Sequence, residues 1–357
     1  MIKYLGSKRR LIPSILGAVR LLPDVRTVVD LFSGTSRVGH ALKSSGYRVL
    51  ANDHNTYAAV WARCYVQADR EDVLATAQRL VQEFNRLPGR PGYFTETFCE
   101  RSRFFQPKNG ARIDAIREEI ERKDLEPELK AVMLTALMEA ADDVDSTTGV
   151  QMAYLKKWAG RAALDLELRI PDVLPRARSG KGRASELDAL AAAEQLEGDV
   201  AYLDPPYNQH SYLGNYHIWE TLARWDKPEV YGCACKRVDR KVRSSAFNSK
   251  HRHEDALRRV VEKIRARWIV LSFNDEGYLT RPTIEKLLQA RGVVTVLSRD
   301  FKRYVGAQIG IYNATGEKVG RVGHPRNTEH IFVVGPHRVD LTVLAGESPD
   351  ARQGVLF

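Results

Sequence analysis

The chain has 357 residues, of which 43% are hydrophobic, and a formal net charge of +10 at pH 7. This composition allows a large buried core and more than one domain. No run approaches the roughly eighteen apolar residues of a membrane span, and the N-terminus lacks a signal-peptide core, so a cytoplasmic protein without membrane attachment is expected. The basic surplus favours a polyanionic partner.

The first predicted unit is a strand, a glycine turn and a helix. The apolar run at 26–32 predicts a buried strand, and the turn follows at 33–39. The next predicted strand, 47–52, ends at Asp53, about twenty residues beyond the turn, where an acid can accept hydrogen bonds from two ribose hydroxyls. Because Ser36 stands where a second glycine is needed, a pyrophosphate on the helix N-terminus is disfavoured. A cofactor with ribose and adenine but no phosphate, such as S-adenosylmethionine, fits better.

The middle of the chain is predicted to be mainly helical. Apolar residues recur at three- and four-residue spacing over 71–85, 113–123 and 128–143. Proline- and glycine-rich breaks are expected between them, one of them at 107–110. The expected division is a catalytic domain formed by 1–60 and 185–337, a helical insertion for target recognition at 61–184, and a flexible tail at 338–357.

The four cysteines argue against a structural metal site. Cys64, Cys99, Cys233 and Cys235 form only one close pair, with no second pair at zinc-ribbon spacing. We expect reduced thiols and no bound metal.

The most informative stretch is Asp204-Pro205-Pro206-Tyr207, which follows the apolar run 199–203. Neither proline has an N–H, so the backbone here offers only carbonyl acceptors beside the Asp204 carboxylate. Together these acceptors can hold both hydrogens of an exocyclic amine. Tyr207 adds a ring face on which a heterocyclic base can stack. The alternative is a tight turn that merely leaves a core strand.

Basic residues gather in sequence on both sides of this edge. They could neutralise phosphates along a duplex, which would make affinity strongly salt-dependent. Solvated helix faces are the alternative for individual residues. The predicted DNA contacts are Lys156, Lys157, Arg161, Arg178, Lys181 and Arg183 before the edge, and Lys236, Arg237, Arg240, Lys241 and Arg243 after it.

Together these segments resemble the alpha-class, Dam-like (D12-type) adenine-N6 DNA methyltransferases. The resemblance covers most of the chain: residues 3–11, the glycine turn, Asp53, the edge at Asp204, and then 271–277, 301–304 and 329–334. It implies a Rossmann-like α/β fold with a mixed, seven-stranded sheet and a mainly helical inserted target-recognition domain. S-adenosylmethionine is the implied cofactor and double-stranded DNA the implied substrate.

The resemblance also implies residue roles. The opening segment would help to hold the methionine end of the cofactor, although a disordered basic N-terminus is the alternative. The acid expected after the third strand is Glu186 or Asp188, and Asp188 is favoured. The implied cofactor residues are Tyr4, Gly6, Ser7, Lys8, Asp30, Phe32, Gly34, Asp53 and Asp188. The target-side segment includes His210 and Tyr212, which are also predicted to contact DNA.

The expected chemistry follows from the electronic structure of adenine. Its amine is a poor nucleophile, because the lone pair is delocalised into the ring. Hydrogen bonds to Asp204 and to the Pro205 carbonyl would stabilise the more tetrahedral nitrogen that forms as the methyl group arrives. Since the amine is inaccessible inside a stacked duplex, the base must flip out, with Tyr207 stacking on it.

Two other function classes compete with DNA adenine methylation. An RNA or protein-glutamine methyltransferase of the same fold is disfavoured by the long helical insertion before Asp204. A non-catalytic DNA-binding protein is disfavoured by the intact Asp30, Asp53, Asp204 and Tyr207. A restriction-modification enzyme with a cognate endonuclease and an orphan regulatory enzyme both remain open.

The last five residues resemble the Gln-x-x-Leu-Phe peptide by which many bacterial DNA-processing enzymes bind the replication sliding clamp. Gln353 would make polar contacts while Leu356 and Phe357 fill an apolar pocket of the clamp. The alternative is that the apolar pair packs onto its own domain.

Overall fold

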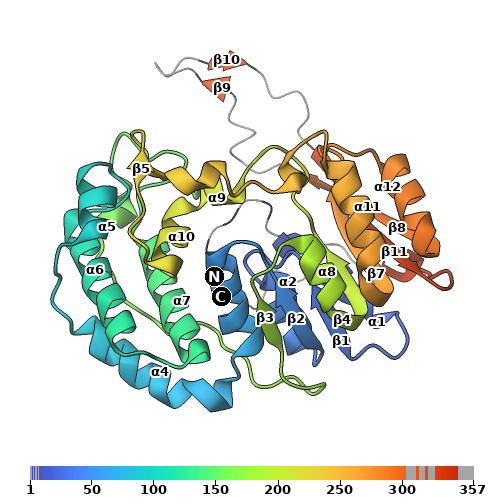
Figure 1. Cartoon of the computed structure of the whole chain (residues 1–357), viewed down its shortest axis with the longest axis horizontal. Coiled ribbons are helices and arrows are strands. Elements are labelled where there is room, and N and C mark those ends of the chain that lie inside the picture. The colour runs from blue at the N-terminus through green and yellow to red at the C-terminus, as the bar shows by residue number, and fades with distance from the viewer. Residues whose placement is uncertain are drawn as a thin grey trace.

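The computed structural model describes residues 2, 4, 6, 8–302, 311–312, 318–320 and 326–344, and for residues 241, 301–302, 311–312, 318–320 and 326 it describes the backbone alone. Ser7 of the predicted cofactor segment and Gln353, Leu356 and Phe357 of the predicted clamp peptide lie outside the described residues. A layered α/β unit occupies one half of the molecule, and a body of helices lies beside it (Figure 1).

The α/β unit is built on a seven-stranded sheet with the order β3-β2-β1-β4-β7-β11-β8. Strand β11 is antiparallel to both of its neighbours, while the strands from β3 to β7 are mutually parallel. The predicted mixed, seven-stranded sheet is therefore confirmed. Its strands are β1 Thr27–Asp30, β2 Arg48–Asn52, β3 Arg183–Ser185, β4 Glu197–Leu203, β7 Arg265–Asn274, β8 Val293–Lys302 and β11 Arg326–Gly335.

Both faces of the sheet are buried because successive side chains point to opposite sides of each strand. Val28 and Val200 belong to the cluster on one face, and Val29 and Ala201 to the cluster on the other. The first face is covered by α1 Ile12–Arg20 and α2 Arg37–Ser44, and the second by α8 Ala189–Gln195, α11 His253–Lys263 and α12 Arg281–Leu288.

The helical body has an apolar core of its own, to which α3, α4, α6, α7 and α10 contribute. Helix α7 lies at its centre and buries most of its residues. Helix α10 comes from the chain after Asp204, so this body is completed by residues from beyond the predicted insertion. The helices are α3 Thr56–Ala62, α4 Arg70–Asn85, α5 Tyr93–Thr95, α6 Pro107–Arg122, α7 Pro127–Asp143, α9 Tyr212–Asn215 and α10 His217–Arg224.

The break predicted at 107–110 is wrong, because these residues form the first turn of α6. Proline is favoured at the first position of a helix, where its missing N–H costs nothing. Gly110 is required by packing, since a Cβ there would lie 2.3 Å from the Cys99 sulfur.

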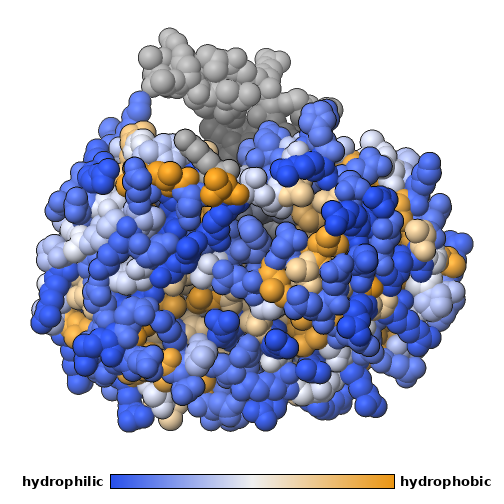
Figure 2. Space-filling model, viewed as in Figure 1, coloured by the Kyte–Doolittle hydropathy of each residue, from blue (hydrophilic) through white to orange (hydrophobic). Residues whose placement is uncertain are grey.

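The remaining strands form two small antiparallel pairs, β5 Val230–Tyr231 with β6 Lys236–Arg237, and β9 Ile311–Tyr312 with β10 Lys318–Gly320. The surface in the view of Figure 2 is mainly hydrophilic, and hydrophobic residues appear there in small, separate groups. Within the described part of the chain, no helix is long and apolar enough to span a membrane.

Candidate active site

A pocket opens at the carboxyl ends of β1, β2 and β4, where Asp30, Asp53 and Asp204 line it together. The strand order reverses between β1 and β4, and ligands of open α/β sheets bind at such a reversal. The predicted site residues that line this one pocket are Tyr4, Gly6, Lys8, Asp30, Phe32, Gly34, Asp53, Asp188, Asp204, Pro206, Tyr212 and Arg243.

The glycine turn is closed by Asp53. Its Oδ2 accepts a hydrogen bond from the Gly34 N–H at 2.9 Å, and its Oδ1 accepts one from the Asn55 N–H at 2.9 Å. Burial raises the pKa of Asp53, and these hydrogen bonds offset part of the rise. Gly34 has a φ of 49° and Ser36 a φ of 58°, so the chain turns through two left-handed residues before α2. The Asn55 side-chain amide donates a second hydrogen bond to Oδ1, at 3.3 Å. Asp53 therefore holds the turn, and its Oδ2 keeps an acceptor site for a ligand.

Asp30 is buried at the end of β1 with an exposed fraction of 1%. Neither carboxylate oxygen has a side-chain partner among the described residues or a backbone hydrogen bond of ordinary geometry, and the nearest backbone donor is the Gly39 N–H. Burial raises the pKa of Asp30 to about 8, the charges of Asp204 and Asp53 act in the same direction, and the Gly39 N–H offsets only part of the rise. A buried carboxylate without a partner is costly, and this one lies where a cationic ligand group would complete it.

Asp204 belongs to a polar cluster at the end of β4. Its Oδ1 accepts a hydrogen bond from the Ser272 hydroxyl at 3.1 Å and lies 3.2 Å from the Lys8 Nζ. Lys8 Nζ also lies 3.2 Å from the Glu329 Oε2. Burial raises the pKa of Asp204, and Lys8 opposes this rise. Lys8, which the family resemblance assigns to the cofactor, thus lies against the carboxylate expected to hold the base.

Tyr207 is half-buried beside this cluster. The Tyr207 ring packs edge-on against Phe273, with 5.8 Å between the two ring centroids. The Lys8 Nζ lies 5.5 Å from the centroid of the Tyr207 ring. The Tyr207 carbonyl accepts a hydrogen bond from the Tyr278 N–H at 2.9 Å, which fixes the backbone after the two prolines.

A stack of tyrosines joins the N-terminal segment to the chain beyond Tyr207. The Tyr4 ring is nearly parallel to the rings of Tyr212, at 5.2 Å, and Tyr216, at 4.4 Å. The Tyr4 hydroxyl lies 3.0 Å from the Tyr57 hydroxyl. Tyr212, predicted to face DNA, therefore forms part of the pocket wall.

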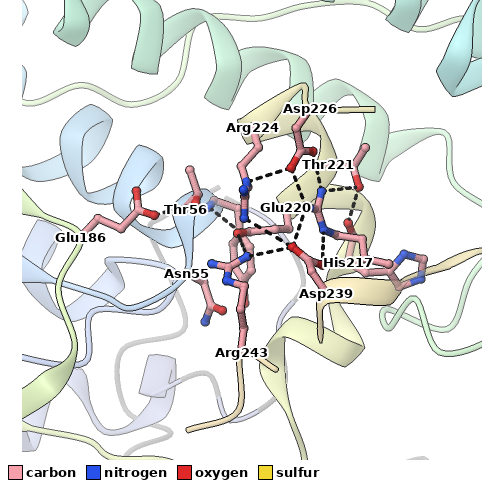
Figure 3. A network of polar contacts seen from close by, with 12 residues as sticks. Asn55, Thr56, Glu186, His217, Glu220, Thr221, Arg224, Asp226, Asp239 and Arg243 are labelled. Carbon is pink, nitrogen blue, oxygen red and sulfur yellow. Dashed lines mark hydrogen bonds and ion pairs between the residues drawn. The ribbon is translucent and has the colours of Figure 1, made fainter. Parts of the chain in front are cut away.

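The sequence left the acid after the third strand as either Glu186 or Asp188. Asp188 lines the pocket and caps α8 by accepting a hydrogen bond from the Leu190 N–H at 2.9 Å. Glu186 instead accepts a hydrogen bond from the Thr56 hydroxyl at 2.7 Å (Figure 3).

Of the predicted DNA contacts, Arg237 lies in the position least suited to contact DNA. It is 1% exposed, and its Nη2 lies 2.7 Å from an Asp226 oxygen and 2.9 Å from an Asp239 oxygen. These two ion pairs hold its guanidinium inside the fold and away from any phosphate. Arg243 lines the pocket and reaches the fully buried Glu220, with 2.6 Å between Nη1 and Oε1 (Figure 3).

Three predicted DNA contacts lie at the opposite edge of the sheet. Arg178 and Lys181 precede β3, and Arg183 is its first residue. The Lys181 carbonyl accepts a hydrogen bond from the side chain of Arg48, the first residue of β2, at 3.2 Å. The amino ends of parallel strands lie away from the pocket. The Lys181 ammonium also pairs with Asp72. These residues therefore do not flank the pocket.

The other predicted contacts have mixed surroundings. Arg161 forms an ion pair with Asp145, and Arg240 bonds to the Tyr231 hydroxyl. Lys156, Lys157 and His210 are exposed, and Lys236 is half-buried. The loop that carries both exposed lysines is tied to α9 by a hydrogen bond from the Gln151 N–H to the Asn215 carbonyl, at 2.8 Å. The side chain of Lys241 is not among those described.

Several pocket residues were not singled out from the sequence. Asn52 directly precedes Asp53, so its place at a strand end was the available signal. Its amide donates to the Leu31 and Leu187 carbonyls at 3.3 and 3.1 Å and thereby ties neighbouring strand ends together. Thr35 and Arg37 belong to the predicted turn at 33–39 but were given no role of their own. The others reach the pocket by tertiary folding, and no local motif marks them: Asn55, Leu187, Ser211, Ser245 and Asn248.

Comparison with known proteins agrees with this geometry. The family model described as D12 class N6 adenine-specific DNA methyltransferase matches residues 4–274. Type II methyltransferase M.FokI of Planomicrobium okeanokoites is 30% identical over 82% of this chain and 47% of its own length. Type II methyltransferase M.NlaIII of Neisseria lactamica is 28% identical over 84% of this chain and 92% of its own length. Modification methylase StsI of Streptococcus sanguinis is 27% identical over 85% of this chain and 48% of its own length. The chain thus spans about half the length of two of these relatives and most of the third.

Proposed function

The chain belongs to the D12 class of N6 adenine-specific DNA methyltransferases, and we propose that it transfers a methyl group from S-adenosylmethionine to the N6 amine of an adenine in double-stranded DNA. The observation that carries this proposal is the single pocket shared by Asp30, Asp53 and Asp204. A donor and an acceptor must meet in one cavity for direct transfer, and this pocket has carboxylates suited to each.

The pocket residues fit S-adenosylmethionine. The unpartnered Asp30 carboxylate suits the ammonium of its methionine end, and Asp53 suits its ribose hydroxyls. The half-buried side chains of Phe32 and Leu187 offer apolar walls for its adenine ring. When bound, this cofactor supplies an electrophilic methyl group on a sulfonium, so that the S–C bond breaks with its electrons left on sulfur.

Asp204 and the Pro205 carbonyl act on the target amine. By accepting its two hydrogens they draw electron density onto nitrogen, which then forms the new N–C bond. The methylated amine must lose one proton, and the ionised Asp204 carboxylate offers an acceptor from which that proton passes to solvent.

The direct test is to incubate the protein and S-adenosylmethionine with a random-sequence plasmid library and to map the methylated bases. N6-methyladenine confined to one sequence context supports the proposal. Methylation of RNA or protein amides in parallel reactions, with none of the plasmid, contradicts it.

Tyr207 is expected to matter through its ring. Replacing Tyr207 by alanine should weaken action on duplex DNA by roughly 1–3 kcal/mol, the value of one stacked base, whereas phenylalanine and tryptophan variants should retain most activity. The phenylalanine variant loses only the hydroxyl, which hydrogen-bonds to Asn274. Measured kcat/KM on duplex DNA separates the variants, and 2-aminopurine at the target position should brighten on binding. Equal losses in the alanine and phenylalanine variants would show that the hydroxyl dominates.

The partners are proposed on separate grounds. Relatives with the names type II methyltransferase and modification methylase favour a cognate endonuclease that cuts the same, unmethylated site. DNA methylated by this protein should then resist that endonuclease.

Clamp binding through Gln353, Leu356 and Phe357 is proposed from the peptide resemblance alone. A peptide spanning residues 348–357 is expected to bind purified clamp with micromolar affinity, about −8 kcal/mol, through its apolar pair. Titration of the intact peptide and of a Leu356→Ala/Phe357→Ala peptide measures this. Failure of the intact peptide to bind rules the interaction out.

A further inference from the structure

We propose that Lys8, together with Ser272 and Glu329, is a positioning residue that orients the Asp204 carboxylate so that a single oxygen, Oδ2, is left to accept the target amine. This inference rests on the proposed function and changes the role that the family resemblance gives to Lys8. The evidence is that Lys8, Ser272 and Glu329, from three distant parts of the chain, gather around the Asp204 carboxylate.

The first observation is that Asp204 Oδ1 is already occupied. It accepts a hydrogen bond from the Ser272 hydroxyl at 3.1 Å and pairs with the Lys8 Nζ at 3.2 Å. Among the described residues, none donates to Oδ2. The carboxylate is therefore held at one oxygen and presented to the pocket at the other.

The second observation is that the hydroxyl chain behind Oδ1 has a fixed direction. The Tyr202 and Ser272 hydroxyls lie 2.8 Å apart, and both residues are buried. A hydroxyl has one proton to donate. Because Ser272 donates to Asp204, Tyr202 must donate to Ser272. Two adjacent strands, β4 and β7, thus fix the donor that points at Oδ1.

The third observation is that the Lys8 ammonium has little capacity left for a cofactor. Its side chain is 5% exposed, and it lies between Asp204 and Glu329, 3.2 Å from each, with the Tyr207 ring on a further side. Burial lowers the pKa of Lys8, but the charges of Asp204 and Glu329 raise it more, to well above its ordinary value. Lys8 therefore stays cationic at any pH at which the enzyme is assayed.

The arrangement predicts that removing Lys8 and removing the charge of Glu329 shift the pKa of Asp204 in opposite directions. Without Lys8, Asp204 faces Glu329 with no cation between them, so its pKa rises. Without the Glu329 charge, Lys8 forms an ion pair with Asp204 alone, and the pKa of Asp204 falls. Asp30, Tyr202 and Tyr207 also face Asp204, but they are unchanged in both variants.

The test measures kcat against pH for the wild type, Lys8→Met, Glu329→Gln and Ser272→Ala, with saturating cofactor and DNA. Asp204 must be ionised to accept the amine, so activity falls on the acid side. We expect this acid limb to move to higher pH in Lys8→Met by about one unit, which is tenfold in rate below the limb. It should move to higher pH by less in Ser272→Ala, and to lower pH in Glu329→Gln. Cofactor affinity should change by less than about threefold. The variants should therefore alter kcat and leave the KM for the cofactor nearly unchanged.

A matched control is Lys43→Met. Lys43 also forms a buried ion pair, 2.9 Å from Asp69, and Asp69 keeps Arg176 as a second partner at 2.7 Å. This variant should be less stable, but its acid limb should not move, because Lys43 is not one of the residues that line the pocket.

The outcomes separate this inference from the proposed function. Acid limbs that superimpose on that of the wild type in all three variants overturn the positioning role, even though the wild type methylates adenine. A loss of cofactor affinity above about tenfold in Lys8→Met, with an unmoved limb, overturns it as well and assigns Lys8 to the methionine end. If the wild type methylates no adenine, the proposed function itself fails.

Discussion

Replacing Asp204 by alanine is expected to lower kcat for adenine methylation by about 10²–10³-fold or more, the cost of removing a preorganised charged acceptor. Cofactor affinity should be retained, because Asp30 and Asp53 rather than Asp204 are proposed to hold the cofactor. Affinity could even rise slightly, since the Asp204 charge contributes to the raised pKa of Asp30.

The fold should survive this substitution. Lys8 keeps its ion pair with Glu329 at 3.2 Å, so no buried cation is left without a partner. Isothermal calorimetry for the cofactor and a single-turnover methylation assay measure the two expectations. Asp204→Asn is the companion variant: it keeps the shape but carries an amide in place of the charge, and we expect it to be nearly as inactive. Cofactor binding and activity lost together would place Asp204 in the cofactor site instead.

The second large effect is expected from Asp30 and depends on pH. Its pKa of about 8 in the free protein means that the carboxyl is protonated at neutral pH. Pairing with a cofactor ammonium requires the ionised form, so the wild-type affinity for S-adenosylmethionine should weaken by about tenfold for each pH unit below 8. Binding should release close to one proton at pH 7, which calorimetry in two buffers of different ionisation enthalpy detects. In Asp30→Asn, affinity should be much weaker and nearly independent of pH.

The same pKa makes Asp30 a source of instability in the free protein. A folded-state pKa raised from 3.8 to about 8 means that the folded chain binds this proton more tightly than the unfolded chain does. The contribution to the free energy of unfolding is therefore greatest below pH 3.8 and declines as the pH rises to 8, by up to about 1.4 kcal/mol per unit. Above pH 8 it declines no further.

Asp30→Asn should abolish this dependence and stabilise the free protein at pH 8. Urea unfolding at several pH values measures the difference from the wild type. The control is Asp255→Asn, which removes an exposed carboxylate on α11 that does not line the pocket. A wild-type minus Asp30→Asn difference that is constant between pH 4 and 8 would contradict a raised pKa at Asp30. Together, the pH dependence of binding and of stability would show that the ionised Asp30 destabilises the free protein and that cofactor binding offsets this destabilisation.

The sequence alone was sufficient to predict the mixed α/β sheet, the methyltransferase family and the strand ends that carry Asp30, Asp53 and Asp204. These features are encoded locally. Strand periodicity, a glycine turn and two consecutive prolines limit the conformations of adjacent residues, whatever the rest of the chain does. Parallel strands then bring their carboxyl ends to one edge, so acids at strand ends meet there.

Only the tertiary structure decided what the charged residues do. Arg237 and Arg243 belong to one basic run in the sequence, yet the first is locked between two aspartates inside the fold and the second lines the pocket. Lys8 meets Glu329 across 321 positions, and α10 joins helices from before Asp204. Charge patterns and periodicity describe neighbours along the chain, whereas the partner of a buried charge is set by long-range packing, because a charge removed from water must be paired wherever the fold places it.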